Sequence, residues 1–114
     1  MKKGDVVLVT FPFTDLSSVK VRPALVISND SYNEVQDDIV LLLITSNVSR
    51  LSPDDYLLKS ENTEFTNTGL MQTSTFRVGK IITLHKKLLN SKLGFIGPNT
   101  LKEIEGKLRN LLQL

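Results

Sequence analysis

Cysteine and tryptophan are both absent from this chain of 114 residues, and histidine occurs once, as His85. Without cysteine the chain has neither a disulfide framework nor a thiolate zinc site, and nothing in the composition requires an oxidising compartment. A single imidazole excludes any mechanism that needs two histidines as acid and base. His85 follows an aliphatic run, and we interpret it as a surface or helix-start residue.

Long hydrophobic runs are missing as well. The apolar run Val6 to Val9 is too short for the core of a signal peptide and far too short to span a membrane. We therefore expect a soluble, cytoplasmic protein with no membrane partner. The length corresponds to one domain, and no repeat or linker-like stretch divides the chain, so we expect a single domain over residues 1–114.

Motifs for metals and nucleotide cofactors are not found either. The acidic pairs Asp37–Asp38 and Asp54–Asp55 stand in expected loops, where neighbouring side chains point apart and usually mark turns. The chain has no P-loop and no dinucleotide-binding glycine motif. We expect a protein that uses no metal and no cofactor.

Charge is unevenly distributed, although the formal net charge is only +2. Residues 23–64 carry eight acidic and two basic side chains, whereas residues 76–114 carry eight basic and two acidic ones. Two interpretations stay open. The chain ends could form a basic surface that binds a polyanion, or the charges could interleave on a solvated surface after folding.

Short aliphatic runs bounded by turn-forming residues predict a mainly antiparallel sheet. The expected strands are residues 6–11, 24–28, 39–45, 56–59, 69–74, 76–84 and 93–96. One helix is predicted over Thr100–Leu112, with Thr100 and Glu103 as a capping box and Pro98 just outside. Its apolar stripe, which should dock on the sheet, is Leu101, Ile104, Leu108, Leu111 and Leu112.

Strands that are apolar on both faces need cover on both faces, and one helix covers only one. We therefore expect the sheet to curl into a small barrel, with a homodimer interface hiding what remains exposed.

An arginine and a proline, Arg22 and Pro23, stand directly before the second strand. If this strand pairs with residues 39–45 so that opposed residue numbers add up to 67, then Arg22 lies opposite Thr45. Pro23 donates no ladder hydrogen bond and restricts Arg22 to extended dihedrals. A guanidinium fork mounted in this way suits a phosphate group.

A second interpretation of the same residues stays open. Arg22 could be an edge charge paired with Asp15 or Asp38, and the polar segment Thr45 to Asn47 could be a simple turn.

The motifs GDVVLVTFP, VRPALVIS, LLLITSN and TGLMQTSTFRVGKIITL, followed by a helix, resemble the MazF/PemK family of toxin endoribonucleases over nearly the whole chain. The resemblance implies an SH3-like β-barrel with a C-terminal α-helix. It also implies a homodimer that cleaves single-stranded RNA without a metal, and an antitoxin that inhibits it and binds DNA with it. Arg22 and Thr45 match the principal catalytic pair of the family.

In the mechanism that this resemblance implies, the neighbouring 2′-hydroxyl attacks the phosphate and leaves a cyclic phosphate. The residues expected to bind RNA are Lys20, Ser46, Asn47, Arg77 and Phe13. Phe13 would stack a base, with a core position as its alternative. Asp15 is the candidate for proton transfer, although an exposed aspartate is a poor base at neutral pH. Some relatives carry arginine and aspartate where this chain has Gln72 and Ser74.

Two other functions stay open on the same fold. The first is a toxin that acts by protein contact, as gyrase inhibitors of this fold do, but these depend on a tryptophan that the chain lacks. The second is a noncatalytic SH3-like binding module. Such a module needs an aromatic-lined groove, whereas the chain has only two tyrosines and five phenylalanines.

Overall fold

The computed structural model describes residues 1–11 and 20–114, which form one antiparallel sheet of six strands with helices packed around it. The strands are β1 (Asp5–Phe11), β2 (Lys20–Val26), β3 (Asp38–Thr45), β4 (Tyr56–Leu58), β5 (Ser74–His85) and β6 (Leu89–Phe95). The helices are α1 (Asp30–Val35), α2 (Pro98–Leu112) and the short 3-10 helices η1 (Thr66–Thr68) and η2 (Lys86–Leu88). None of these helices is long and apolar enough to cross a membrane.

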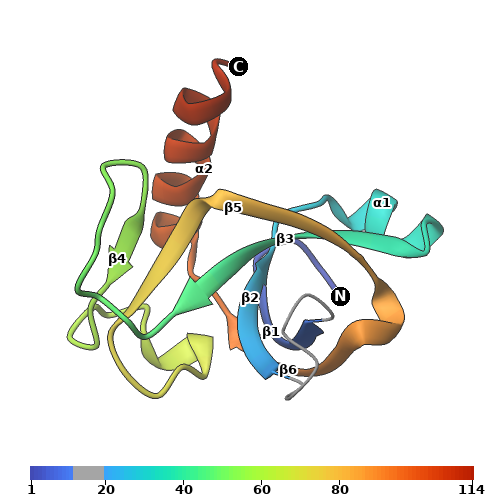
Figure 1. Cartoon of the computed structure of the whole chain (residues 1–114), viewed down its shortest axis with the longest axis horizontal. Coiled ribbons are helices and arrows are strands. Elements are labelled where there is room, and N and C mark those ends of the chain that lie inside the picture. The colour runs from blue at the N-terminus through green and yellow to red at the C-terminus, as the bar shows by residue number, and fades with distance from the viewer. Residues whose placement is uncertain (12–19) are drawn as a thin grey trace.

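The strand order is β4-β5-β3-β2-β1-β6, and the sheet curls strongly around β1 and β2 (Figure 1). Over the described residues β4 and β6 are unpaired edges, so the barrel is not closed by hydrogen bonds between them. The expected mainly-β, barrel-like fold with a C-terminal helix is confirmed with this refinement.

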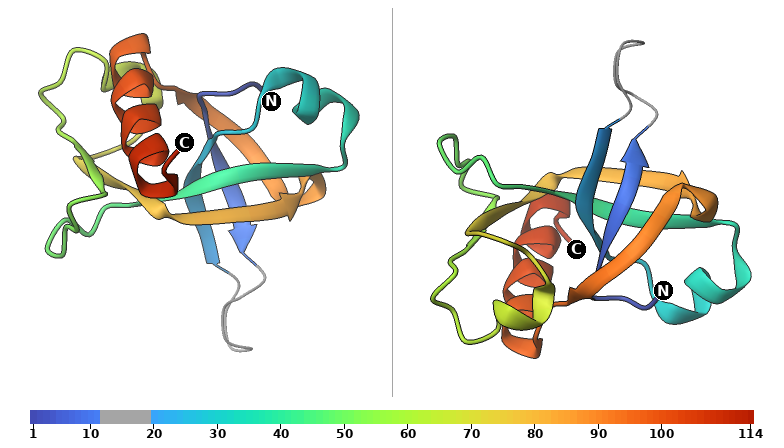
Figure 2. Two further views of the ribbon diagram at one scale, coloured as in Figure 1. Left: turned by 90° about the horizontal axis from the view of Figure 1, so that it is seen from above. Right: turned by 90° about the horizontal axis from the view of Figure 1, so that it is seen from below.

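The aliphatic strands bury both of their faces. On the outer face a core forms between the sheet and α2, which packs there beside β4 and η1 (Figure 2). Its buried members are Val6, Leu25, Leu42, Ile44, Leu58, Phe65, Phe76, Val78, Ile96 and Ile104. On the inner face the curled sheet encloses a second core. Its buried members are Val7, Val9, Phe11, Ala24, Val26, Ile39, Leu41 and Leu84. The sheet therefore covers one face by curling and the other with a helix, as the strand pattern required.

A bulge in β5 changes the face that its side chains occupy. Leu42 pairs with Ile81 while the next residue, Leu43, pairs with Arg77, so three residues of β5 have no counterpart on β3. Such insertions bend a strand and redirect its side chains, and the bend in β5 is visible in Figure 1. As a result Phe76 belongs to the outer core, whereas Ile82 packs against the inner one.

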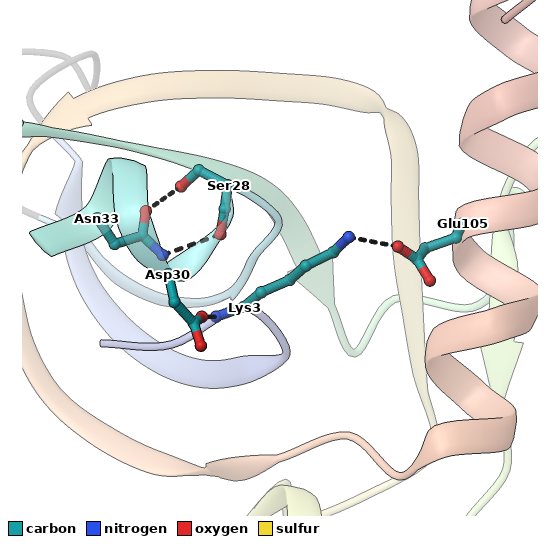
Figure 3. A network of polar contacts seen from close by, with 5 residues as sticks. All are labelled: Lys3, Ser28, Asp30, Asn33 and Glu105. Atoms are coloured by element: carbon teal, nitrogen blue, oxygen red, sulfur yellow. Dashed lines mark hydrogen bonds and ion pairs between the residues drawn. The ribbon is translucent and has the colours of Figure 1, made fainter.

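The segment between β2 and β3 contains the short helix α1. The side chain of Asn29 caps it by accepting the backbone N–H of Tyr32 at 2.8 Å. Lys3 then ties this region to α2, because its backbone N–H donates to Asp30 and its ammonium group pairs with Glu105 (Figure 3).

The buried side chain of Asn33 fixes the crossing from β2 to β3 (Figure 3). Its amide donates to the backbone oxygen of Ser28 at 2.9 Å, and its Oδ1 accepts the Ser28 hydroxyl. Ser28 Oγ in turn accepts the backbone N–H of Val40 at 3.1 Å. These bonds fix the connection between β2 and β3 at the end of the sheet where the two strands are paired.

The predicted capping box of α2 is wrong. The helix begins at Pro98, so this proline lies in the first turn and not outside the helix. Glu64, rather than Glu103, caps the helix. Glu64 Oε1 accepts the Thr100 backbone N–H and the Thr100 hydroxyl, both at 2.7 Å, and Oε2 accepts the Asn99 N–H at 3.2 Å. These bonds, the one from the Thr100 hydroxyl above all, lower the pKa of Glu64 below its ordinary value of 4.5.

The apolar stripe of α2 docks over only part of its length. Ile104 is buried and Leu101 and Leu108 pack against the outer core, whereas Leu111 and Leu112 are exposed. The expectation that the whole stripe packs on the sheet is therefore correct for its first three members only.

The predicted strand over residues 69–74 is also wrong. This stretch follows η1, begins with Gly69 at a left-handed φ of 74°, and joins β5 only at Ser74. The cause is tertiary, since a Cβ on Gly69 would stand 2.3 Å from the Leu93 backbone oxygen, and one on Gly94 would stand 2.1 Å from the Asn67 oxygen. The two backbones touch directly, which glycine permits.

Candidate active-site cleft

A cleft of about 890 Å³ opens where β2 and β3 diverge. The ladder between these strands pairs only Ala24–Val26 with Leu41–Leu43. The first residues of β2 and the last residues of β3 therefore separate, and both stretches line the cleft. Residues 69–72 and the bulged part of β5 complete the lining.

The register that we predicted holds over the paired residues, because Ala24 lies opposite Leu43 and Val26 opposite Leu41. The ladder nevertheless ends before it reaches Arg22 and Thr45. These two residues line the same cleft from different strands and do not form a hydrogen-bonded cross-strand pair. Their separation leaves space for a ligand between them.

The cleft gathers most of the residues predicted to form the site. Those that line it are Lys20, Arg22, Thr45, Ser46, Asn47 and Arg77. Phe13 and Asp15 lie outside the described residues, although Phe11 and Lys20, which flank that segment, both line the cleft. His85 lies elsewhere, exposed at the start of η2, where its Nδ1 accepts the Lys87 N–H at 3.1 Å.

Sequence reasoning missed Lys80 and Met71, and it named Gln72 only as a departure from the family pattern. Lys80 reaches the cleft because the β5 bulge redirects the strand, a signal that only the paired structure contains. Met71 lines the cleft with 96% of its surface exposed, and Gln72 lines it next to Met71, in the same segment as Gly69.

Thr45 begins a polar turn at the edge of the cleft. Its Oγ1 accepts the backbone N–H of Asn47 at 3.1 Å, and the Asn47 side-chain oxygen accepts the N–H of Ser49 at 3.1 Å. A hydroxyl has one proton to donate and two lone pairs to accept with, so Thr45 can accept from its own turn and still donate to a ligand. The turn interpretation of this segment and the binding interpretation are thus compatible.

The charge of the cleft has one sign. Its described lining carries Lys20, Arg22, Arg77 and Lys80 and includes no carboxylate. Asp55 lies behind the lining, with Oδ2 3.3 Å from Nε of Arg77. Over residues 1–11 and 20–114 no three side chains of histidine, aspartate or glutamate gather as metal ligands would. The cleft therefore suits an extended anion with apolar parts, because leucine, methionine and phenylalanine side chains line it between the cations.

A curled antiparallel sheet, a helix on its outer face and a cationic cleft at diverging strand ends define a class of small barrel proteins that can hold an anionic chain. Residues 2–112 match the family described as PemK-like, MazF-like toxin of type II toxin-antitoxin system. The chain is also 32% identical over 97 residues to endoribonuclease MazF2 of Mycobacterium bovis, which covers 83% of this chain and 81% of that protein. The chain thus belongs to the PemK-like, MazF-like toxin family of type II toxin-antitoxin systems.

Solved structures show the same fold. An endoribonuclease in complex with its cognate antitoxin from a mycobacterial species has a TM-score of 0.79 at 24% identity, over 100% of this chain and 96% of that one. MazF from Deinococcus radiodurans has a TM-score of 0.77 at 23% identity, over 100% and 97% of the two chains. The resemblance stated from the sequence motifs, to a toxin endoribonuclease family, is confirmed.

Proposed function

We propose that this toxin is a metal-independent endoribonuclease that cuts single-stranded RNA in the cleft between β2 and β3. The observation that carries the proposal is the presence of Arg22 and Thr45 on different strands of one cleft whose described lining bears only positive charge. The names of its relatives, which are endoribonucleases, support the reaction class.

In this mechanism RNA supplies its own nucleophile. The 2′-hydroxyl forms a bond to the adjacent phosphorus, the bond from phosphorus to the 5′-oxygen breaks, and a cyclic phosphate remains on the upstream fragment. Arg22 binds the non-bridging oxygens as their charge grows. The Thr45 hydroxyl donates a hydrogen bond to the phosphate or orients the attacking 2′-hydroxyl. Such positioning and charge stabilisation can supply most of the rate enhancement.

Two protons have to move, one from the 2′-hydroxyl and one to the leaving 5′-oxygen. The described lining has neither a carboxylate nor an imidazole. Asp15, which lies outside the described residues, is our candidate for one transfer, and the Arg22 guanidinium is our candidate for delivery of the other proton to the leaving group. Lys20, Ser46, Asn47 and Arg77 would hold the RNA, and Phe13 would stack a base.

The partners follow from the same family. One similar structure is a complex with a cognate antitoxin, and another is a MazE–MazF complex from Deinococcus radiodurans. We propose that this toxin, too, is bound and inhibited by an antitoxin, that it acts as a homodimer, and that it works in the cytoplasm, where mRNA is found. We also propose that residues 1–114 form one domain.

The test is cleavage of a long mixed-sequence RNA in EDTA by the wild type, by Arg22→Ala and by Lys102→Ala, with the fragment ends mapped. Lys102 is an exposed lysine of α2 that does not line the cleft, so its variant controls for the loss of one charge. We expect cuts at one short motif that end in cyclic phosphate, lost in Arg22→Ala and kept in Lys102→Ala. If the folded wild type cuts no RNA, the cleft serves a binding module or a protein-targeting toxin instead.

A further inference from the structure

Arg77 is held from behind by a buried carboxylate. Its Nε lies 3.3 Å from Oδ2 of Asp55, whose side chain is 3% exposed against 37% for Arg77. A turn fixes the carboxylate, because Oδ2 also accepts the Ser52 N–H at 3.1 Å while the Asp55 N–H donates to the Ser52 oxygen at 3.0 Å. Asp55 does not line the cleft, so it can affect a ligand only through Arg77.

The geometry of this ion pair leaves the end of the arginine fork available. The contact runs through Nε, which is buried and not aligned for a hydrogen bond, so the attraction is ionic. Among the described residues, the two Nη nitrogens of Arg77 donate no hydrogen bond to the protein. A guanidinium anchored at Nε therefore presents two parallel N–H donors in the cleft that Arg77 lines.

Several apolar side chains line the same cleft as this fork. Leu43 lies directly across from Arg77 on β3, and the bulge brings Ile82 into the same lining. Leu70 and Met71 line the cleft as well, Met71 with its side chain almost wholly exposed. Apolar side chains beside two fixed donors match a nucleobase, which has apolar faces and a polar edge.

Arg77 also lies close to the proposed reaction centre. Thr45 is paired with Thr75, and Leu43 with Arg77, so Arg77 lies two residue pairs along the β3–β5 ladder from Thr45, on the same face of the sheet. Two residues along a strand correspond to about 7 Å. A group bound by Arg77 would therefore belong to a nucleotide next to the phosphate held by Arg22 and Thr45.

We propose that Arg77, oriented by Asp55, recognises a guanine next to the cleaved bond. This inference rests on the proposed ribonuclease function. Guanine presents two acceptors, O6 and N7, on one edge, and a bidentate arginine is their commonest specific partner. Adenine offers a donor beside its acceptor at this edge, which two N–H donors do not match. Asp55 is a positioning residue, and Arg77 is the residue that reads the base.

The experiment maps the cut sites of the wild type, Asp55→Asn, Arg77→Lys and Asp54→Asn on a randomised RNA library in EDTA. We expect the wild-type motif to contain a guanine, preferred over adenine by roughly 5- to 150-fold, as for one bidentate contact. Asp55→Asn and Arg77→Lys should still cut but lose most of this preference. Asp54→Asn removes the same charge from the neighbouring residue, which makes no hydrogen bond or ion pair among the described residues, and should keep it.

A 7-deazaguanosine at the motif guanine sharpens the test, because it removes the N7 acceptor alone. Wild-type cleavage should slow on this substrate, whereas Asp55→Asn should cut both substrates at similar rates. Thermal melts establish that each variant is folded, and Arg77→Lys tests the same claim if Asp55→Asn does not fold. A motif without guanine, or unchanged base preference in both folded variants while overall rates fall, would assign Arg77 to the phosphate and overturn the inference. If the wild type cuts no RNA at all, the proposed ribonuclease function is overturned, rather than the role of Arg77 alone.

Discussion

The two faces of the sheet are similarly aliphatic but are covered in different ways. The outer face is covered by α2, and the polar groups of Asn99 and Thr100 in its first turn donate hydrogen bonds to Glu64. The inner face is enclosed by the curl of the sheet, which opens where β2 and β3 separate. There Arg22 makes no ion pair with any described residue, and Lys20 and Lys80 make none either.

This difference separates polar residues that hold the fold from those left for a ligand. Buried polar groups cost free energy unless they are hydrogen-bonded, so the satisfied groups on the outer side are explained by folding alone. Lys20, Arg22 and Lys80 gain no ion pair with any described residue, and cations that share one cleft repel one another. Binding of an anionic ligand explains why they gather there.

The outer core should carry the largest share of stability. Phe76 is fully buried there and meets Tyr56 edge-on, with ring centroids 6.3 Å apart. We expect Phe76→Ala to lower the free energy of unfolding by about 3–5 kcal/mol, measured by urea denaturation. Arg22→Ala, on the open side, should change it little, and a similar loss in both variants would contradict the contrast between the faces.

The open side should carry the activity. Thr45→Val keeps the shape and removes the hydroxyl that we assign to the phosphate. We expect kcat for RNA cleavage to fall by about 10²–10³-fold, the usual cost of one lost transition-state donor. Single-turnover cleavage measures this directly, and circular dichroism shows whether the fold persists. Undiminished kcat in a folded Thr45→Val would remove Thr45 from the mechanism.

Two fully buried threonines give a matched comparison. The Thr68 hydroxyl donates to the Phe65 oxygen at 2.7 Å and accepts the Leu70 N–H at 3.1 Å. The Thr75 hydroxyl, across from Thr45, has no partner in the described part of the chain. Thr68→Val should therefore destabilise the protein by about 1–3 kcal/mol, while Thr75→Val should leave it unchanged or slightly more stable. Equal losses in the two melts would show that Thr75 is satisfied in solution.

The Glu64 cap should give the smallest and most pH-dependent effect. The pKa of Glu64 is lowered in the folded state, so its contribution is present above the ordinary value of 4.5 and is lost as the pH falls through the folded pKa. We expect Glu64→Gln to melt at a lower temperature than the wild type at pH 7. The gap should narrow below about pH 4.5, and a gap that stays constant down to pH 3 would exclude the charge as its cause.

The local sequence pattern was enough to predict strands β1, β2 and β3 and the pairing of β2 with β3. The aliphatic runs at β1, β2 and β3 are bounded by turn-forming residues, and this predicted the three strands. The lengths of the second and third runs predicted the register that sets Ala24 opposite Leu43. The same register placed Arg22 and Thr45 at one end of the sheet, where the cleft opens.

The errors came from contacts between distant segments. Glu64 caps α2 by accepting from Thr100, which lies 36 residues further along the chain. The spacing of Thr100 and Glu103 instead suggested a capping box within the helix itself. The strand expected at residues 69–74 gave way to a backbone contact of Gly69 with β6. Lys80 enters the cleft through a bulge that exists only once β5 has paired with β3.

The most direct test of the central claim is an amide NMR titration with a single-stranded RNA that carries the mapped cut sequence and a 2′-deoxy group at the cut nucleotide. This substitution removes the nucleophile but leaves the phosphates and bases. We predict no cleavage and large amide shifts at Arg22, Thr45 and Arg77, with α2 unaffected. Cleavage of this RNA, or shifts centred on α2 with the cleft unchanged, would contradict it.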